Sequence, residues 1–446
     1  MTPRRILAGS WVVFLVYAYP GYMRYDAADE LTDSRAGSIS DWHSPMLTEL
    51  WRLVGRAISG PAGMLALQSL LLLVGSYALL RRAIADRTAA IAAACVLLAP
   101  PLIATSAVID GEAQLAAVLV AGAAALASSR PRVRIAGLGL LVVAAGMCDG
   151  AALAIFPIVV ALWRWPSGAV RWRQVAVATA TWLAIAGAAA GIDALLVDMH
   201  TRRPDVELAM VDIVGTLDHM DVDDGDPAAA LAGVPLASPS DVLERARRGY
   251  GRVDDYARGD DRVFDPPSTA GERDALIAAR RTLARTAPLA YARHRAHVLA
   301  QLLGLGRRPP RWLPLYTKFV PSPGDRTVLE FDAHHSLAQR ILTAPVRALA
   351  RTVLFRPWLY AIAALVLVGV AAVRRRGLAL VVLASGLCYE LARGLETARP
   401  DYRDSHWLIV ATALALALAI ARPRSELGDE RVGDETALGV ADDHRV

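Results

Sequence analysis

Residues 6–45 read ILAGSWVVFLVYAYPGYMRYDAADELTDSRAGSISDWHSP and join an apolar run to a segment rich in carboxylates. The part from 6 to 23 has about the length that a helix needs to cross the hydrocarbon core of a bilayer. Arg4 and Arg5 precede it, and the polar segment from 25 to 45 follows directly. The sequence therefore predicts a first membrane helix that ends in an acidic loop at the membrane surface.

The composition of the whole chain extends this prediction. Its 446 residues are 55% hydrophobic, with a mean hydropathy of +0.36, whereas soluble domains are about 45–50% apolar. The run 135–163 is interrupted at Asp149, where two short helices turning back would place both flanking arginine clusters on one side of the membrane. The predicted fold class is an all-α polytopic membrane protein with about ten transmembrane helices. The apolar runs lie at 6–23, 61–80, 88–108, 112–129, 135–163, 174–196, 355–373, 377–394 and 405–421.

Arginines lie in short clusters between the apolar runs, as at 81–82 and 374–376, and Lys318 is the only lysine. Cytoplasmic loops are enriched in such residues, so both termini are expected in the cytoplasm. The bias toward arginine and alanine is typical of GC-rich bacteria and indicates a bacterial cytoplasmic membrane. Because the basic residues follow the topology, we expect membrane lipids and no nucleic acid as partners.

The predicted topology divides the chain into four parts. Residues 1–196 form an N-terminal transmembrane module with its first external loop at 24–60, and 197–350 form an extracytoplasmic loop or lid domain. Residues 351–424 carry the last transmembrane helices. The acidic, polar tail 425–446 is expected to be disordered and cytoplasmic.

The acidic loop contains carboxylates at helical spacing. Asp26, Asp29 and Asp33 recur three and four residues apart, with Glu30 one turn after Asp26, so a helix would align them along one face. Like charges repel there, and the arrangement costs stability unless cations or a ligand offset it. One interpretation is a solvated helix face. The other is a functional site, which the position directly after a membrane span favours.

Two further motifs reach the same side of the membrane. Asp41 and His43 flank a tryptophan in DWHSP, where His43 either binds substrate or supports a proline turn. Asp110 and Glu112 lie in VIDGEAQ, between two apolar runs. These residues extend the predicted acidic site.

Cations at this side are candidates for binding an anionic phosphate. The candidates on the outward side are Arg24, Lys318, Arg393 and Arg403. For Arg403 an ion pair with Asp401 or Asp404 is an equal alternative.

Other kinds of site find little support in the sequence. Cys95, Cys148 and Cys388 are isolated, and His294 and His297 lack the spacing of zinc ligands. No GxSxG elbow, P-loop or dinucleotide fingerprint is present. Hydrolase, ATPase and redox functions are therefore not indicated.

These motifs resemble those of GT-C glycosyltransferases, the group with the protein O-mannosyltransferases, aminoarabinose transferases and lipopolysaccharide core galacturonosyltransferases. The resemblance covers roughly residues 1–200. Asp26 with Ala27 stands where the family has its first-loop acidic motif, although the only Asp-Glu pair of this loop is Asp29-Glu30. Ser44-Pro45 replaces a double proline, and Asp110 is similar to a second acidic position.

The resemblance implies transfer of a sugar from a polyprenyl-phosphate donor to an extracytoplasmic glycolipid, polysaccharide or protein. Asp26 or Asp29 would be the general base, and Asp110 or Asp29 would orient the acceptor or a divalent cation, Mg²⁺ or Mn²⁺. Arg403 or Lys318 would bind the donor phosphate, with Arg24, Asp41 and His43 as further substrate ligands.

Two alternatives stay open. A transporter or flippase would favour charged or broken helices at mid-membrane and two similar halves, whereas the ionisable residues here gather at helix ends. An O-antigen polymerase or ligase would use outer-loop residues such as Arg293 and His297 in place of Asp26.

Overall fold

The computed structural model describes residues 1–39, 43–163, 171–198, 204–221, 227–250, 256–257, 262–305, 315–320, 329 and 334–421. In these residues regular structure is helical, apart from isolated β-bridges that pair Tyr22 with Val108 and Leu236 with Phe264. The predicted all-α class is confirmed. Asp41 and the predicted tail 425–446 lie outside the described residues.

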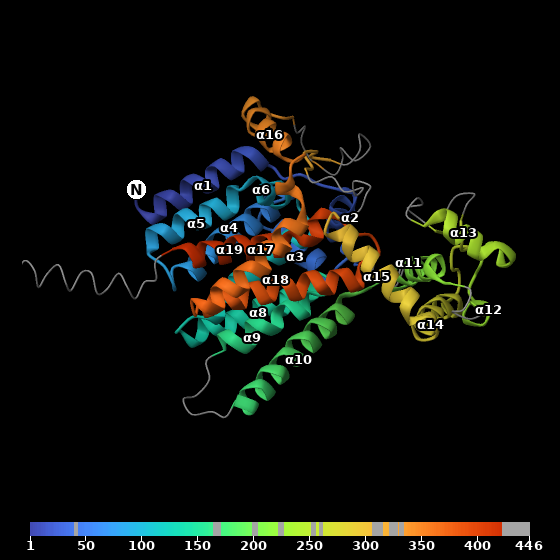
Figure 1. Ribbon diagram of the computed structural model, residues 1–446. Coiled ribbons are helices and arrows are strands. Elements are labelled where there is room, and N and C mark those ends of the chain that lie inside the picture. The colour runs from blue at the N-terminus through green and yellow to red at the C-terminus, as the bar shows by residue number, and fades with distance from the viewer. Residues whose placement is uncertain are drawn as a thin grey trace, which may run out of the picture.

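Each predicted apolar run corresponds to a helix or helix pair of one bundle (Figure 1). Among the described residues, four helices are long and apolar enough to cross a membrane, or five if one bent pair is counted as a single span. Three more apolar helices are shorter. The predicted polytopic membrane fold is confirmed. The bundle comprises α1 (Pro3–Ala18), α4 (Pro61–Leu80), α5 (Asp86–Leu98), α6 (Pro100–Ser106), α7 (Gly111–Leu126), α8 (Pro131–Met147), α9 (Ala151–Leu162), α10 (Arg171–Leu196), α17 (Pro357–Val373), α18 (Gly377–Glu396) and α19 (His406–Ile420).

The long apolar run 135–163 is broken where the arginines predicted a turn. Helix α8 ends at Met147 and α9 begins at Ala151. Gly150 between them has φ +79°, and a Cβ built there would lie 2.7 Å from Ala392 Cβ of α18. Glycine fits this position because it adopts positive φ and leaves room for the neighbouring helix.

The run 88–108, predicted as one straight helix, is instead bent by 65° between α5 and α6. Pro100 and Pro101 follow the break. Proline lacks an amide hydrogen and clashes with the preceding turn, so it ends one helix and starts the next.

Two short helices, α2 (Tyr25–Ala36) and α3 (Pro45–Gly55), form the first loop. A later loop contains the 3₁₀ turn η5 (Tyr402–Ser405), which precedes α19. Both loops lie at the end of the bundle that is opposite the N-terminus of α1 (Figure 1). This end holds most of the predicted site residues.

A helical insert stands beyond this end of the bundle (Figure 1) and has its own hydrophobic core. Ile213, Leu217, Phe264, Leu276 and Leu283 are among its buried residues. Burying these side chains stabilises the insert. The insert comprises α11 (Pro204–His219), α12 (Pro227–Ala230), η2 (Pro239–Asp241), α13 (Val242–Gly249), α14 (Ala270–Thr286) and α15 (Pro288–Leu302). The chain then returns through α16 (Leu337–Leu349) and η4 (Val353–Phe355) to α17.

Candidate functional site

Backbone hydrogen bonds hold three distant segments together at this end of the bundle. The Tyr22 amide donates to Ala107 O (3.0 Å), and the Ile109 amide donates to Tyr22 O (2.9 Å). The next amide, that of Met23, donates to Lys318 O (3.0 Å). These bonds fix the start of α2 between the start of α7 and the segment 315–320.

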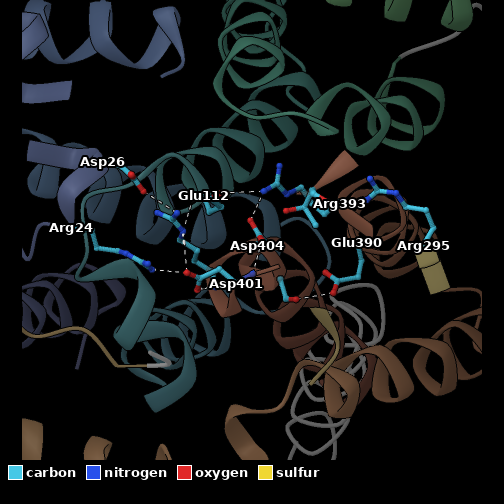
Figure 2. A network of polar contacts seen from close by, with 11 residues as sticks. Arg24, Asp26, Glu112, Arg295, Glu390, Arg393, Asp401 and Asp404 are labelled. Atoms are coloured by element: carbon cyan, nitrogen blue, oxygen red, sulfur yellow. Dashed lines mark hydrogen bonds and ion pairs between the residues drawn. The ribbon is translucent and has the colours of Figure 1, made fainter. Parts of the chain in front are cut away.

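Five charged side chains meet here and form what we call the edge cluster: Arg24, Asp26, Glu112, Asp401 and Arg403. Arg403 Nη2 donates to Asp26 Oδ2 (3.0 Å) and Arg24 Nη1 donates to Asp401 Oδ2 (2.7 Å). Arg403 Nε lies 3.7 Å from Asp401 Oδ2 and 3.9 Å from Glu112 Oε2. Figure 2 shows that these groups converge from α2, α7 and the loop around η5. The ion pair of Arg403 with Asp401, proposed from the sequence as an alternative, is present, and Asp26 shares the same guanidinium.

Asp26 is the accessible carboxylate of the edge cluster. Its side chain is 49% exposed, against 12% for Glu112 and 14% for Asp401. Burial of part of the carboxyl raises its pKa, but the charge and hydrogen bond of Arg403, with smaller contributions from His43 and Arg24, outweigh burial and lower the pKa below 3.8. Asp26 is therefore an ionised acceptor that a molecule from outside the protein can reach.

Asp110 caps α7 and is buried. Its Oδ1 accepts a hydrogen bond from the Ala113 amide (2.9 Å), as an N-cap carboxylate typically does. Burial and then the charge of Glu112 raise its pKa, more than Arg403 lowers it. One Asp110 oxygen is thus committed to the helix start, while Glu112, two residues later, faces the arginines. Of these two acidic residues, Asp110 was the one selected from the sequence as a site residue.

Glu30 and His43 form a second, more buried pair beside Asp26. Glu30 Oε1 lies 3.9 Å from His43 Nδ1, and both side chains are 8% exposed. Burial and then the charge of Asp26 raise the pKa of Glu30 well above 4.5. Burial lowers the pKa of His43 despite the nearby carboxylates. Both shifts favour the neutral forms. Asp29 of the same helix is exposed instead.

Lys318 lies near this site through its backbone, which accepts from Met23 as described above. Its side chain is exposed, and no carboxylate partner for it is found in the described part of the chain. Of the residues selected from the sequence, the structure thus joins Asp26 and Arg403 directly and links Arg24 to Arg403 through Asp401. Asp110, His43 and Lys318 lie around them.

A second layer of polar groups supports η5 from α18. Arg393 was one of the cations considered from the sequence, whereas Glu390 and Ser405 were not selected. Arg393 donates to Asp404 and lies 3.8 Å from Glu112 Oε1. Ser405 Oγ donates to Glu390 Oε1 (2.7 Å). Figure 2 shows this layer beside the edge cluster. The available signal was a glutamate and an arginine three residues apart in an apolar helix, because such residues in a membrane span need a partner.

The insert contains a further group, the insert cluster, in which three members are buried and Arg280 is partly exposed: Asp212, Arg280, His294 and Arg295. Asp212 accepts from His294 Nε2 (3.0 Å), Arg280 Nε (2.6 Å) and Arg295. Burial raises the pKa of Asp212, but the His294 hydrogen bond and the two arginines outweigh it and lower the pKa. Arg295 Nη1 also donates to Thr397 O (2.9 Å), so the cluster contacts the loop that leads to η5.

Metal ligation is not suggested by this geometry. Among the residues that the structure describes, no group of three or more His, Cys, Asp or Glu side chains is placed to share a metal ion. The described residues therefore offer no ligand set for the Mg²⁺ or Mn²⁺ that the family resemblance implies.

Comparisons with known proteins add little to the site. No family model and no curated protein matches the sequence. A solved structure with some likeness is ArnT from Cupriavidus metallidurans in the apo state, with 13% identity and a TM-score of 0.30. The alignment covers 93% of this chain and 77% of that chain. At this TM-score the likeness carries no argument about activity, so the function is argued from the residues of this chain.

Proposed function

We propose that this protein is an integral membrane glycosyltransferase that moves a sugar from a polyprenyl-phosphate donor to a hydroxyl acceptor outside the cytoplasm. The observation that carries the proposal is the edge cluster, in which the accessible Asp26 carboxylate lies 3.0 Å from Arg403. An ionised base beside a guanidinium at the end of a membrane bundle suits a substrate whose reacting phosphate lies at the membrane surface.

In the proposed reaction the acceptor hydroxyl attacks the anomeric carbon of the sugar. Asp26 takes the hydroxyl proton as the new C–O bond forms, because a hydroxyl is a poor nucleophile without a base. The bond between the anomeric carbon and the phosphate oxygen breaks, and the polyprenyl phosphate leaves with the electron pair. Asp26 rather than Asp29 is proposed as the base, because Asp26 contacts the arginine that belongs to the site.

The phosphate of the donor needs cationic groups as its charge grows in the transition state. Arg403 and Arg24 are each already shared with carboxylates, so a phosphate would compete with Asp26 and Asp401 for them. Lys318 has its ammonium exposed. We therefore propose Lys318 as the first phosphate ligand and Arg403 as a group that reorients toward the phosphate when the donor binds.

The test compares two neighbouring carboxylates. A strain in which the chain is deleted would be complemented with wild type, Asp26→Asn or Asp29→Asn at equal protein level, and envelope glycans and glycolipids would be profiled by mass spectrometry. We expect a sugar that disappears on deletion to return with wild type and Asp29→Asn, but not with Asp26→Asn, which can no longer accept a proton. Restoration by Asp26→Asn would remove that residue as the base.

The same strains separate the alternatives. A transporter would leave covalent glycan structures unchanged on deletion while a substrate accumulates on one side of the membrane. An O-antigen ligase would lose activity in Arg293→Ala or His297→Ala. These two residues lie on α15, where Arg293 pairs with Asp221 (3.1 Å) and His297 with Gln301 (2.8 Å). We expect both variants to keep activity.

A further inference from the structure

Helix α16 has three distinct faces along its length. One face is buried against the protein and contains Gln339, Thr343 and Val346. The opposite face is apolar but exposed, with Leu337 67% and Ile341 61% exposed. At 100° per residue these two side chains point within about 40° of one another, and Ala344 and Ala348 continue the same face.

A row of arginines runs along one edge of this exposed apolar face. Arg340 and Arg347 are seven residues apart, so they lie two turns apart on the same side of the helix. Arg351 follows one turn later, just past the end of α16. All three are exposed, and no ion pair with a carboxylate is found for any of them in the described residues. The described segment from 334 to 356 contains no acidic residue, so no carboxylate within it offsets this charge.

The position of α16 is fixed relative to the membrane bundle. Gln339 Nε2 donates to Tyr19 O (2.7 Å), at the C-terminal end of α1. After α16 the chain enters the apolar helix α17 at Pro357, only a few residues later. Figure 1 shows α16 at the side of the bundle, next to the end of α1 and to α6. The helix therefore lies at the depth where a spanning helix leaves the hydrocarbon core.

The apolar face of α16 continues a surface that already faces lipid. In α1, Val12 is 55% exposed, Val13 and Val16 are each 44% exposed, and Tyr19 next to α16 is 56% exposed. Exposed apolar side chains on a membrane helix are contacted by lipid tails. An amphipathic helix with an arginine edge at this depth has the composition of a helix that lies in the membrane interface.

We infer that α16 lies in the bilayer surface, with Leu337 and Ile341 among the lipid chains, and that Arg340, Arg347 and Arg351 bind the phosphate of anionic phospholipids. Long arginine side chains extend from an apolar surface to the headgroups, which places their charge at the phosphate level. Each exposed arginine attracts anionic lipid at such a surface. This lipid site is separate from the edge cluster and does not depend on the proposed transfer reaction.

The test uses the full chain in lipid nanodiscs. A bimane fluorophore is attached to Ile341→Cys after Cys95, Cys148 and Cys388 are replaced by alanine. The discs contain phosphatidylcholine and phosphatidylglycerol in a 7:3 ratio, and in separate samples the same mole fraction of one or the other carries a quenching doxyl group on its chain. We expect strong quenching by both lipids, and at least about twofold more by doxyl-phosphatidylglycerol because the arginines enrich it nearby.

A variant with all three arginines changed, Arg340→Gln, Arg347→Gln and Arg351→Gln, should lose the difference between the two lipids but keep the quenching. A control with the same loss of charge in the insert, Arg248→Gln, Arg281→Gln and Arg285→Gln, should behave as wild type. Absence of quenching by either lipid would overturn the inference and indicate that water or a second copy of the chain covers this face. Aqueous iodide would distinguish these two cases, because it quenches a fluorophore exposed to water but not one covered by protein. Equal quenching by both lipids in wild type would overturn the anionic-lipid site.

Discussion

The edge cluster and the insert cluster are built from similar residues but differ in how completely the carboxylate is enclosed. In the insert, Asp212 is 0% exposed and accepts from His294, Arg280 and Arg295. At the bundle end, the side chain of Asp26 is 49% exposed and has one arginine donor, Arg403. A fully satisfied, enclosed carboxylate acts as a structural crosslink, whereas a half-open one can exchange its partner for a ligand. The difference in enclosure suits the insert cluster to stabilising the fold, and it supports the proposal that the edge cluster binds substrate.

The largest effect is expected for the enclosed carboxylate. Asp212→Asn would leave the buried Arg295 and the partly exposed Arg280 without their counter-charge. Breaking a buried pair by removing one partner costs about 3–5 kcal/mol. Hydrogen exchange of the α11 and α15 amides would measure the loss as faster exchange from local opening.

Asp241→Asn is the matched control within the insert, because Asp241 also accepts from an arginine but lies at the surface. We expect it to leave the exchange of α11 unchanged. If Asp212→Asn also exchanged as wild type, the contrast between the enclosed and the open cluster would be wrong.

An intermediate effect is expected for the arginine that holds Asp26 ionised. Arg403→Gln removes the largest influence that lowers the Asp26 pKa, so that pKa rises. A nearby opposite charge favours the ionised carboxylate. A general base works only when deprotonated, so the acid limb of the kcat/KM profile should move to higher pH. The measurement is transfer rate against pH with the purified protein.

Arg24→Gln provides the graded control. Its charge also lowers the Asp26 pKa, but less than that of Arg403 does. The acid limb should therefore move in the same direction by a smaller amount. An unchanged profile in Arg403→Gln, with transfer still measurable, would show that Asp26 is not the titrating base.

The sequence predicted the helical bundle well because uncharged apolar runs have few alternatives to membrane helices. It also located the break at Asp149, because the two arginine clusters that flank the run 135–163 lie on the same side of the membrane only if the chain crosses it an even number of times between them. The bend between α5 and α6 was missed although Pro100 and Pro101 were visible, because an apolar run suggested one continuous span. Proline can kink a membrane helix without ending it, so the pattern alone did not decide.

The location of the site was predictable from the sequence, but which charged residues pair with one another was not. Topology placed Asp26 and Arg403 at the same side, yet their contact joins residues 377 positions apart and is set by how the loops pack. The insert cluster was missed because Asp212 looks like any acidic residue of a polar segment. Only the fold shows that it is enclosed by His294 and Arg295. Residue type indicates charge, whereas packing determines which charge stays accessible.

The smallest effect is expected for Glu30, which combines features of the insert cluster and the edge cluster. It is enclosed like Asp212, but in the described residues it lacks an arginine donor. Burial raises its pKa in the folded protein above the 4.5 of the unfolded chain. The folded state then binds more protons than the unfolded state above pH 4.5, so the stability that Glu30 contributes falls as pH rises through the folded-state pKa.

Glu30→Gln cannot ionise and escapes this loss. Thermal unfolding of wild type and variant in the same detergent from pH 4.5 to 8 should therefore show midpoints that diverge in favour of the variant as pH rises. A difference that stays constant over this range would mean that Glu30 is ionised in the folded protein and belongs with the open edge cluster.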